Sequence, residues 1–232
     1  MTSYLLVHGG SQGEWCWQRL VPLLKQSRKV SGVAAPDLPG HGARAGEPHE
    51  GITLDDYVNC VVDEAERREM LDIVLVGHSL GGITVIAAAP RLAARLKRVV
   101  FLGGMVPDEG ASAAQMLAKR WQKGPLEAER IAAAGQRQVF CSDMDDATAR
   151  WFLSQITPEP RKPLETPIHV STLPRGVPIS YIVQTKDMSL SPEFQRYLLK
   201  NLNKPEVLEL ASGRNGMFSV PEQLAKLLLR WS

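Results

Sequence analysis

The chain has 232 residues, a length that suits one large α/β domain with a core of its own. Apolar residues make up 44% of the chain and charged residues 22%, values typical of folded proteins, which excludes global disorder. The 27 basic and 25 acidic residues leave a net charge of +2, which gives no support for a nucleic-acid-binding protein.

Short apolar runs alternate with helical patterns along the chain. Runs rich in β-branched residues predict strands over residues 4–7, 30–34, 73–76, 99–102, 179–183 and 206–210. Apolar residues at helical spacing predict helices over residues 15–26, 54–70, 81–96, 192–201 and 221–231. This alternation predicts an α/β fold, with a mostly parallel sheet and helices on both faces.

One stretch interrupts the alternation. Residues 105–174 contain no predicted strand and hold helical segments followed by a connector rich in proline: Pro158, Pro160, Pro163, Pro167 and Pro174. Ligands of open α/β sheets bind at the carboxyl ends of the strands, so we expect residues 105–174 to form a small helical cap there. Residues 1–104 and 175–232 would form the core; a helical pair that only packs on this core is the alternative.

The sharpest motif is G-x-S-x-G at residues 77–81, between the predicted strand 73–76 and the predicted helix 81–96. A serine on a tight strand-to-helix turn leaves no room for side chains on nearby residues, which explains the glycines. The turn raises the Ser79 hydroxyl above the sheet edge and points the helix amino end at developing negative charge. We therefore predict Ser79 as a nucleophile and the Leu80 amide as part of an oxyanion hole.

Two glycines also follow the first predicted strand. In His8-Gly9-Gly10 a bare backbone can approach a substrate oxygen, so the Gly10 amide is the second predicted oxyanion donor. We expect Gly9 and His78 to border the substrate pocket. His8 and His41 are expected to order their loops by hydrogen bonding rather than to transfer protons.

These motifs resemble the α/β-hydrolase superfamily over nearly the full length of the chain. The compact branch of plant methyl esterases, hydroxynitrile lyases and their bacterial relatives is similar at H-G-G (8–10), G-x-W-C-W (13–17), P-L (22–23), M-V-P (105–107) and S-P-E-F-Q (191–195). The resemblance implies the hydrolase fold and a triad in the chain order serine, acid, histidine. It places the acid at Asp187, after the predicted strand 179–183; Asp37 and Asp143 are weaker candidates, since neither follows a late strand.

The triad histidine is where the sequence departs from this pattern. The resemblance places it at Arg214, or at Asn215 if the register slips by one, and no histidine follows His169. Arginine stays protonated in proteins, so Arg214 cannot accept the Ser79 proton. Arg214 could instead form a salt bridge with Asp187 and offer a fixed positive charge to an anionic ligand.

Two explanations would restore a base. His169, in the proline-rich connector, could reach Ser79 from the cap side as an alternative base. The chain could also be an altered variant of an esterase that had histidine at position 214. Loss of a triad member lowers turnover by a factor on the order of 10⁴ to 10⁶, although an oxyanion hole still leaves some catalysis.

Apolar side chains near these residues are candidates for a substrate pocket. We expect Trp121, Trp151 and Met217 to line it, although mutual packing of the cap helices would account for the tryptophans equally well. Such a pocket implies a small, partly apolar substrate. Cyanohydrin cleavage is not favoured, because the lyases of this branch have a hydroxyl residue at the position of Gly9 and a lysine at that of Asn215.

Three functions fit these residues. The first is an esterase- or lactonase-type hydrolase that attacks a small ester, lactone or carbonyl compound with Ser79. The second is a non-hydrolytic cyclase, isomerase, decarboxylase or dehydratase, in which the oxyanion hole stabilises an enolate while Arg214 and Asp187 handle charge or protons. The third, a small-molecule receptor, is disfavoured because such a protein has little need of a nucleophile turn.

Nothing in the sequence indicates a metal, a cofactor or a membrane partner. The three cysteines, Cys16, Cys60 and Cys141, lack metal-ligand spacing, and no apolar run reaches the roughly 18 residues needed to span a bilayer. The first residues lack a signal-peptide core. We therefore expect a cytoplasmic monomer or homodimer that acts on a small molecule without a cofactor.

Overall fold

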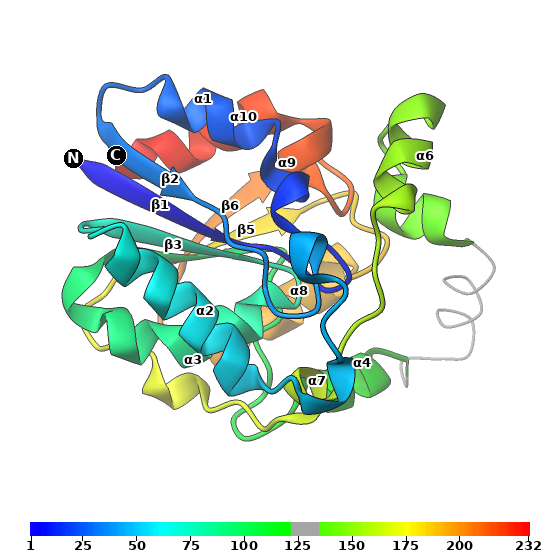
Figure 1. Cartoon of the computed structure of the whole chain (residues 1–232), viewed down its shortest axis with the longest axis horizontal. Helices are drawn as coiled ribbons and strands as arrows, with labels where there is room; N and C mark the ends of the chain where they lie inside the picture. The colour runs from blue at the N-terminus through cyan, green and yellow to red at the C-terminus, as the bar shows by residue number, and fades with distance from the viewer. Residues whose placement is uncertain (122–134) are drawn as a thin grey trace.

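In residues 1–121 and 135–232, which the computed structural model describes, six parallel strands form one sheet in the order β2-β1-β3-β4-β5-β6 (Figure 1). The strands are β1 (Thr2–Val7), β2 (Val30–Ala34), β3 (Ile73–His78), β4 (Leu96–Leu102), β5 (Ile179–Gln184) and β6 (Glu206–Leu210). The predicted α/β fold class is confirmed.

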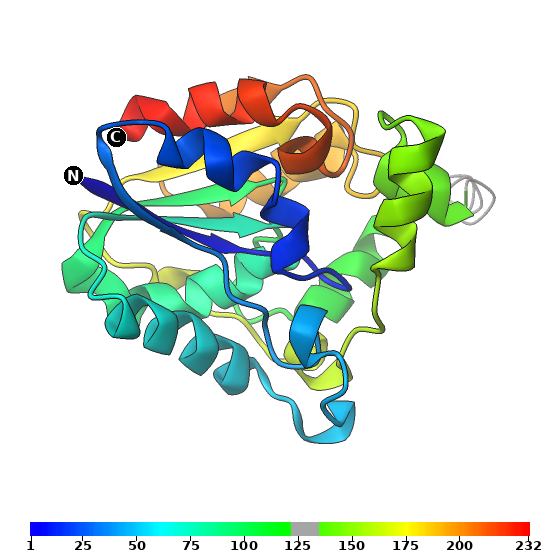
Figure 2. The ribbon, with the colours of Figure 1, turned by 45° about the horizontal axis from the view of Figure 1, so that its top comes forward.

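Helices cover both faces of this sheet (Figures 1 and 2). On one face lie α1 (Leu20–Lys25), α9 (Gly216–Ser219) and α10 (Pro221–Leu228). On the other face lie α2 (Leu54–Arg67), α3 (Gly81–Leu92) and α8 (Pro192–Leu198). The chain order of the strands reverses beside β1, with β2 on one side and β3 on the other, a switch point at which open α/β sheets bind ligands.

Alternate residues of each strand point into two separate cores. In β1, Leu5 and Val7 belong to the core under α2 and α3, whereas Tyr4 and Leu6 belong to the core under α1 and α10. All four side chains are fully buried. Each such side chain contributes about 1.5–3 kcal/mol on burial, which is why a central parallel strand is a continuous apolar run.

Several element boundaries differ from the predicted ones. The predicted helix 15–26 is a 3₁₀ turn over Glu14–Trp17 followed by the shorter α1. Strand β4 begins at Leu96, three residues before its predicted start. The prediction missed this start because the polar residues Lys97 and Arg98 interrupt the apolar run. Helix α2 begins as predicted, where Thr53 and the third helical residue form a capping box.

Between β4 and β5 the described residues form helices rather than strands, apart from one isolated bridge. These helices are α4 (Ala113–Trp121), a stretch over 135–141, α6 (Asp146–Ser154) and α7 (Arg161–Glu165). Phe152 of α6 packs against Trp15 and Phe218, at ring distances of 4.8 and 5.4 Å. Because Trp15 follows β1 and Phe218 follows β6, α6 lies at the carboxyl end of the sheet, as Figure 1 shows.

None of the helices in the described ranges combines the length and apolar character needed to cross a membrane.

Candidate active site

Ser79 lies on the turn between β3 and α3, with a left-handed φ of +54°. A Cβ atom on Gly81 would come within 2.5 Å of the His8 carbonyl oxygen, and one on Gly77 within 2.9 Å of the Gly81 carbonyl oxygen. Only glycine therefore fits at both positions, and this close backbone packing holds the strained serine in place. Ser79 is 7% exposed.

Arg214 lies between Ser79 and Asp187 and contacts both side chains. Its Nη1 donates a hydrogen bond to Asp187 Oδ2 at 2.6 Å, and its Nη2 donates to Ser79 Oγ. Arg214 follows β6 and Asp187 follows β5, so the parallel sheet brings the two residues to the same edge. Both residues are almost fully buried. The guanidinium thus lies between the predicted nucleophile and the predicted acid, with a hydrogen bond to each.

The Asp187 carboxylate has further donors besides Arg214. Its Oδ1 accepts the amides of Ser189 at 2.7 Å and Leu190 at 3.1 Å, and its Oδ2 accepts Gln195 Nε2 at 3.3 Å. Burial raises the pKa of Asp187, and the Arg214 charge opposes that rise. Gln195 was not predicted as a site residue, although it ends the S-P-E-F-Q segment.

Two buried side chains hold the backbone of Arg214. Gln184 Nε2 donates to the carbonyl oxygens of Gly213 and Arg214, both at 2.8 Å. His78 Nε2 lies 2.9 Å from the Arg214 carbonyl oxygen, and burial together with the Arg214 charge keeps the pKa of His78 well below its usual value. The neutral ring therefore donates its Nε2 proton to this carbonyl. His78 also packs edge-on against Trp17 and does not line the cavity beside Ser79.

The loop after β1 lies directly against the nucleophile turn. A Cβ atom on Gly9 would come within 2.7 Å of the Ser79 Cβ, and one on Gly10 within 2.4 Å of the Leu80 side chain. The Gly10 and Leu80 amides, predicted as oxyanion donors, have no hydrogen-bond acceptor among the described residues. Both are thus available to a ligand oxygen.

His8 orders this loop, as predicted. Its Nδ1 lies 2.8 Å from the Gly9 carbonyl oxygen, and its Nε2 accepts the Leu38 amide at 3.1 Å. Nε2 must therefore be unprotonated and Nδ1 must carry the proton. Burial and the neighbouring His41 lower the pKa of His8 to about 4, so this neutral tautomer persists at neutral pH.

His169 is not brought to Ser79. Its side chain is 62% exposed, and its Nδ1 lies 3.0 Å from the Glu109 carboxylate at the surface. The predicted alternative base therefore has no route to the Ser79 proton in this structure. Arg214 is the side chain that contacts Ser79 Oγ.

The predicted pocket residues have different surroundings. Trp151 is 38% exposed and stacks on Phe218, with the rings 5.4 Å apart. Met217 is fully buried in the core under α10. The side chain of Trp121 lies outside the described part of the chain. Neither Trp151 nor Met217 lines the cavity at the Ser79 turn, whose lining includes Leu80 and Gly81 but not Ser79.

That cavity is small, at ≈ 10 Å³. It is bordered on one side by Gly9, Gly10 and Leu80, and on the other by Tyr57 and Glu159. A space of this size holds at most about one water molecule. Glu159 carries no predicted role, because a lone carboxylate among prolines has no spacing pattern that marks it.

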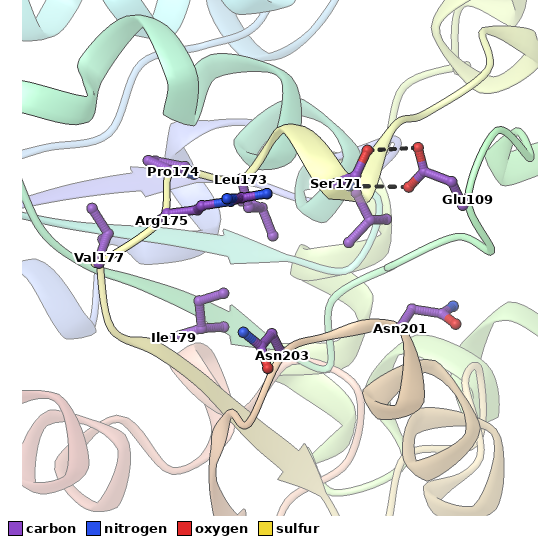
Figure 3. A pocket seen from close by; sticks show the side chains of 11 residues that line it. Glu109, Ser171, Leu173, Pro174, Arg175, Val177, Ile179, Asn201 and Asn203 are labelled. Atoms are coloured by element: carbon purple, nitrogen blue, oxygen red, sulfur yellow. Dashed lines mark hydrogen bonds between the residues drawn. The ribbon is translucent and has the colours of Figure 1, made fainter.

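A larger pocket lies elsewhere, beside the loop that precedes β5 (Figure 3). Its volume is ≈ 420 Å³, and Glu109, Ser171, Arg175 and Asn201 are among its lining residues. Figure 3 shows Ser171 hydrogen-bonded to Glu109 at one end of this pocket. It shares no lining residue with the small cavity. In the described ranges, no group of histidine, cysteine and acidic side chains is arranged to hold a metal ion.

Fold and turn geometry define the class of protein: the chain belongs to the alpha/beta hydrolase family, whose sequence profile matches residues 4–227. It is 27% identical to Methylesterase 9 of Arabidopsis thaliana over 253 residues, covering 99% of this chain and 98% of that protein. It is 34% identical to the Carbendazim hydrolyzing esterase of Nocardioides sp. (strain SG-4G) over 119 residues, covering 51% of this chain and 48% of that esterase.

Among solved structures, polyneuridine aldehyde esterase is similar, with a TM-score of 0.85 and 22% identity over 99% of this chain and 98% of that one. An extracellular α/β-hydrolase from a Paenibacillus species has a TM-score of 0.84 at 22% identity, covering 100% of this chain and 99% of the other. The predicted similarity to the methyl esterase branch is confirmed.

Proposed function

We propose that this protein is an esterase-type enzyme that binds a small, partly apolar ester or other carbonyl compound at Ser79, and that Arg214 keeps its hydrolytic rate low. The names of its relatives support the esterase type. The free amides of Gly10 and Leu80 support the binding of a carbonyl oxygen next to Ser79. The observation that carries the proposal is the contact of Arg214 with both Ser79 and Asp187.

The chemistry follows from the charge of arginine. A guanidinium donates hydrogen bonds and accepts none, so Arg214 cannot remove the Ser79 proton. Because Ser79 Oγ accepts from Arg214, its own hydrogen is free to donate to a ligand. Without its base, the serine loses a factor on the order of 10⁴ to 10⁶ in turnover, while oxyanion stabilisation and binding retain part of the catalysis.

Arg214→His tests this proposal. The new imidazole lies between Ser79 and Asp187, so we expect hydrolysis of p-nitrophenyl acetate to rise at least about 10³-fold over the unmodified chain. Arg214→Asn is the matched control, because it removes the cation without adding a base. Ser79→Ala in the Arg214→His background should abolish the gain. A rise in the asparagine variant as large as that in the histidine variant would refute the proposed role of the base.

A second candidate function rests on the same contact. Arg214 presents a fixed positive charge beside the Ser79 hydroxyl, an arrangement suited to stabilising an enolate in non-hydrolytic chemistry on a carbonyl compound. The α-proton would pass to solvent water, since Arg214 cannot accept it. This candidate predicts exchange of the α-protons of a small β-keto ester with D₂O that is faster than the exchange without protein, followed by NMR. An acceleration that persists in both Ser79→Ala and Arg214→Ala would refute it.

A further inference from the structure

The Glu159 carboxylate lies beside the loop that follows β1, although Glu159 belongs to the segment between α6 and α7. Its Oε2 accepts the Ser11 amide at 2.7 Å and would lie 2.8 Å from a Cβ atom on Gly10. The Thr157 amide donates to the Ser11 carbonyl oxygen at 3.0 Å and fixes this segment against the loop. A carboxylate from the segment between α6 and α7 is thus the immediate neighbour of a predicted oxyanion donor.

Two further side chains surround this carboxylate. The Tyr57 hydroxyl donates to Glu159 Oε1 at 3.2 Å, and His41 Nε2 lies 3.4 Å from Glu159 Oε2. His41 Nδ1 lies 3.1 Å from Thr157 Oγ1. Burial and the Glu159 charge raise the pKa of Tyr57, so its hydroxyl stays protonated and remains a donor. Three separate parts of the chain thus meet here, at His41, at Tyr57 and at the segment with Thr157 and Glu159.

Among the described residues, no lysine or arginine forms an ion pair with Glu159. In the described part of the chain, His41 is the one basic side chain within 4.0 Å of its carboxylate. The Glu159 side chain is 14% exposed. A shielded carboxylate without a permanent cationic partner opposes nearby negative charge and attracts positive charge more strongly than one in bulk water.

The small cavity joins this charge to the predicted oxyanion donors. Gly10, Leu80 and Glu159 all line it. A carbonyl oxygen bound by the Gly10 and Leu80 amides would therefore lie at the wall of a cavity that Glu159 also lines. A ligand group next to the carbonyl carbon is the part that would contact the carboxylate.

We propose that Glu159 is a specificity-determining residue of the Ser79 site and selects carbonyl compounds that carry an ammonium group on the carbon next to the carbonyl. The inference rests on the proposed function, since it takes the Ser79 site as the ligand site. The ammonium group donates to the Glu159 carboxylate while the carbonyl oxygen accepts from the two amides. If Glu159 only held the segment between β4 and β5 in place, its replacement would affect charged and neutral ligands equally.

A matched pair of esters tests the charge directly. L-Alanine ethyl ester and ethyl isobutyrate differ by an ammonium group in place of a methyl group. In Arg214→His at pH 7, we expect the higher kcat/KM for the alanine ester. Adding Glu159→Gln should lower the ratio of the two kcat/KM values by about tenfold, because the charge is lost while an acceptor oxygen remains.

Glu109→Gln is the control, since the Glu109 carboxylate also accepts a backbone amide and a hydroxyl, both from Ser171, but lines the other pocket. It should leave the ratio within about twofold. Binding to the chain with Arg214 in place gives a second measure. L-Alanine amide should raise its Tm more than isobutyramide does, and Glu159→Gln should remove the difference.

The outcomes separate the two proposals. Two outcomes overturn the selectivity of Glu159 and leave the proposed function standing. In the first, Glu159→Gln lowers kcat/KM equally for both esters. In the second, it leaves both values unchanged while the two amides raise the Tm equally. If Arg214→His hydrolyses neither of these esters nor p-nitrophenyl acetate, the proposed function is overturned, and the amide binding then decides the role of Glu159 by itself.

Discussion

Replacing Arg214 with methionine would keep most of the side-chain volume and remove the cation from a buried ion pair. Asp187, which is 3% exposed, would lose its 2.6 Å partner. Removing one partner of a buried pair typically costs 3–5 kcal/mol, and the donors that remain, among them Ser189, Leu190 and Gln195, place the expected loss near the lower end, at about 3 kcal/mol.

Urea unfolding at pH 7 measures this loss. Arg161→Met is the matched control, because its side chain is 86% exposed and its ion pair with Glu165 is worth less than about 0.5 kcal/mol. Adding Asp187→Asn to Arg214→Met removes the unpaired charge and should recover about half of the loss.

The pH dependence gives an independent check. Burial already raises the pKa of Asp187, and without Arg214 the pKa rises further. Below that pKa the folded variant holds a proton that the unfolded chain releases, so its deficit should shrink as the pH falls from 7 to 5. A loss under about 1 kcal/mol at pH 7, or a deficit that does not change with pH, would refute the reasoning.

Three further variants test the packing around the site by urea unfolding. Gly81→Ala places a methyl group 2.5 Å from the His8 carbonyl oxygen and should cost about 2 kcal/mol or more, whereas Gly51→Ala, with nothing within 4 Å, should cost under about 0.5 kcal/mol. Phe152→Ala removes a fully buried ring of α6 and should cost about 3–5 kcal/mol; a loss near zero would mean that α6 is not anchored through it. The pKa of His8 is about 4 in the folded chain and about 6.5 when unfolded, so the unfolded chain binds the proton more readily between these values. Stability should therefore fall by up to about 3 kcal/mol from pH 6.5 to pH 4, and His8→Gln should flatten that slope.

Much of the sheet could be predicted because central parallel strands are continuous apolar runs. β3, fully buried on both faces, is the clearest case. Strand β4 was predicted too short, since Lys97 and Arg98 at its start are partly exposed and break the apolar run. The helix after β1 was predicted as one segment, but buried Trp17 lies in a separate 3₁₀ turn that packs against His78.

At the site, residues fixed by local geometry could be predicted, and those brought in by distant segments could not. The turn around Ser79 has a motif whose glycines follow from sterics. The pairing of Arg214 with Asp187 was open in the sequence and is formed in the structure. Glu159 contacts Ser11 across 148 residues, and no periodicity links the two.

Arg214, which donates a hydrogen bond to the Ser79 hydroxyl, also changes how the site responds to pH. In a histidine-based esterase, the imidazole loses its proton near pH 6.5, so acidity switches the nucleophile on and off. A guanidinium is not deprotonated in proteins and offers no such switch. His8 and His78, two of the buried imidazoles near the site, have lowered pKa values and stay neutral near pH 7. The charge nearest the Ser79 hydroxyl therefore does not switch with acidity near neutrality, unlike the imidazole of a histidine-based esterase.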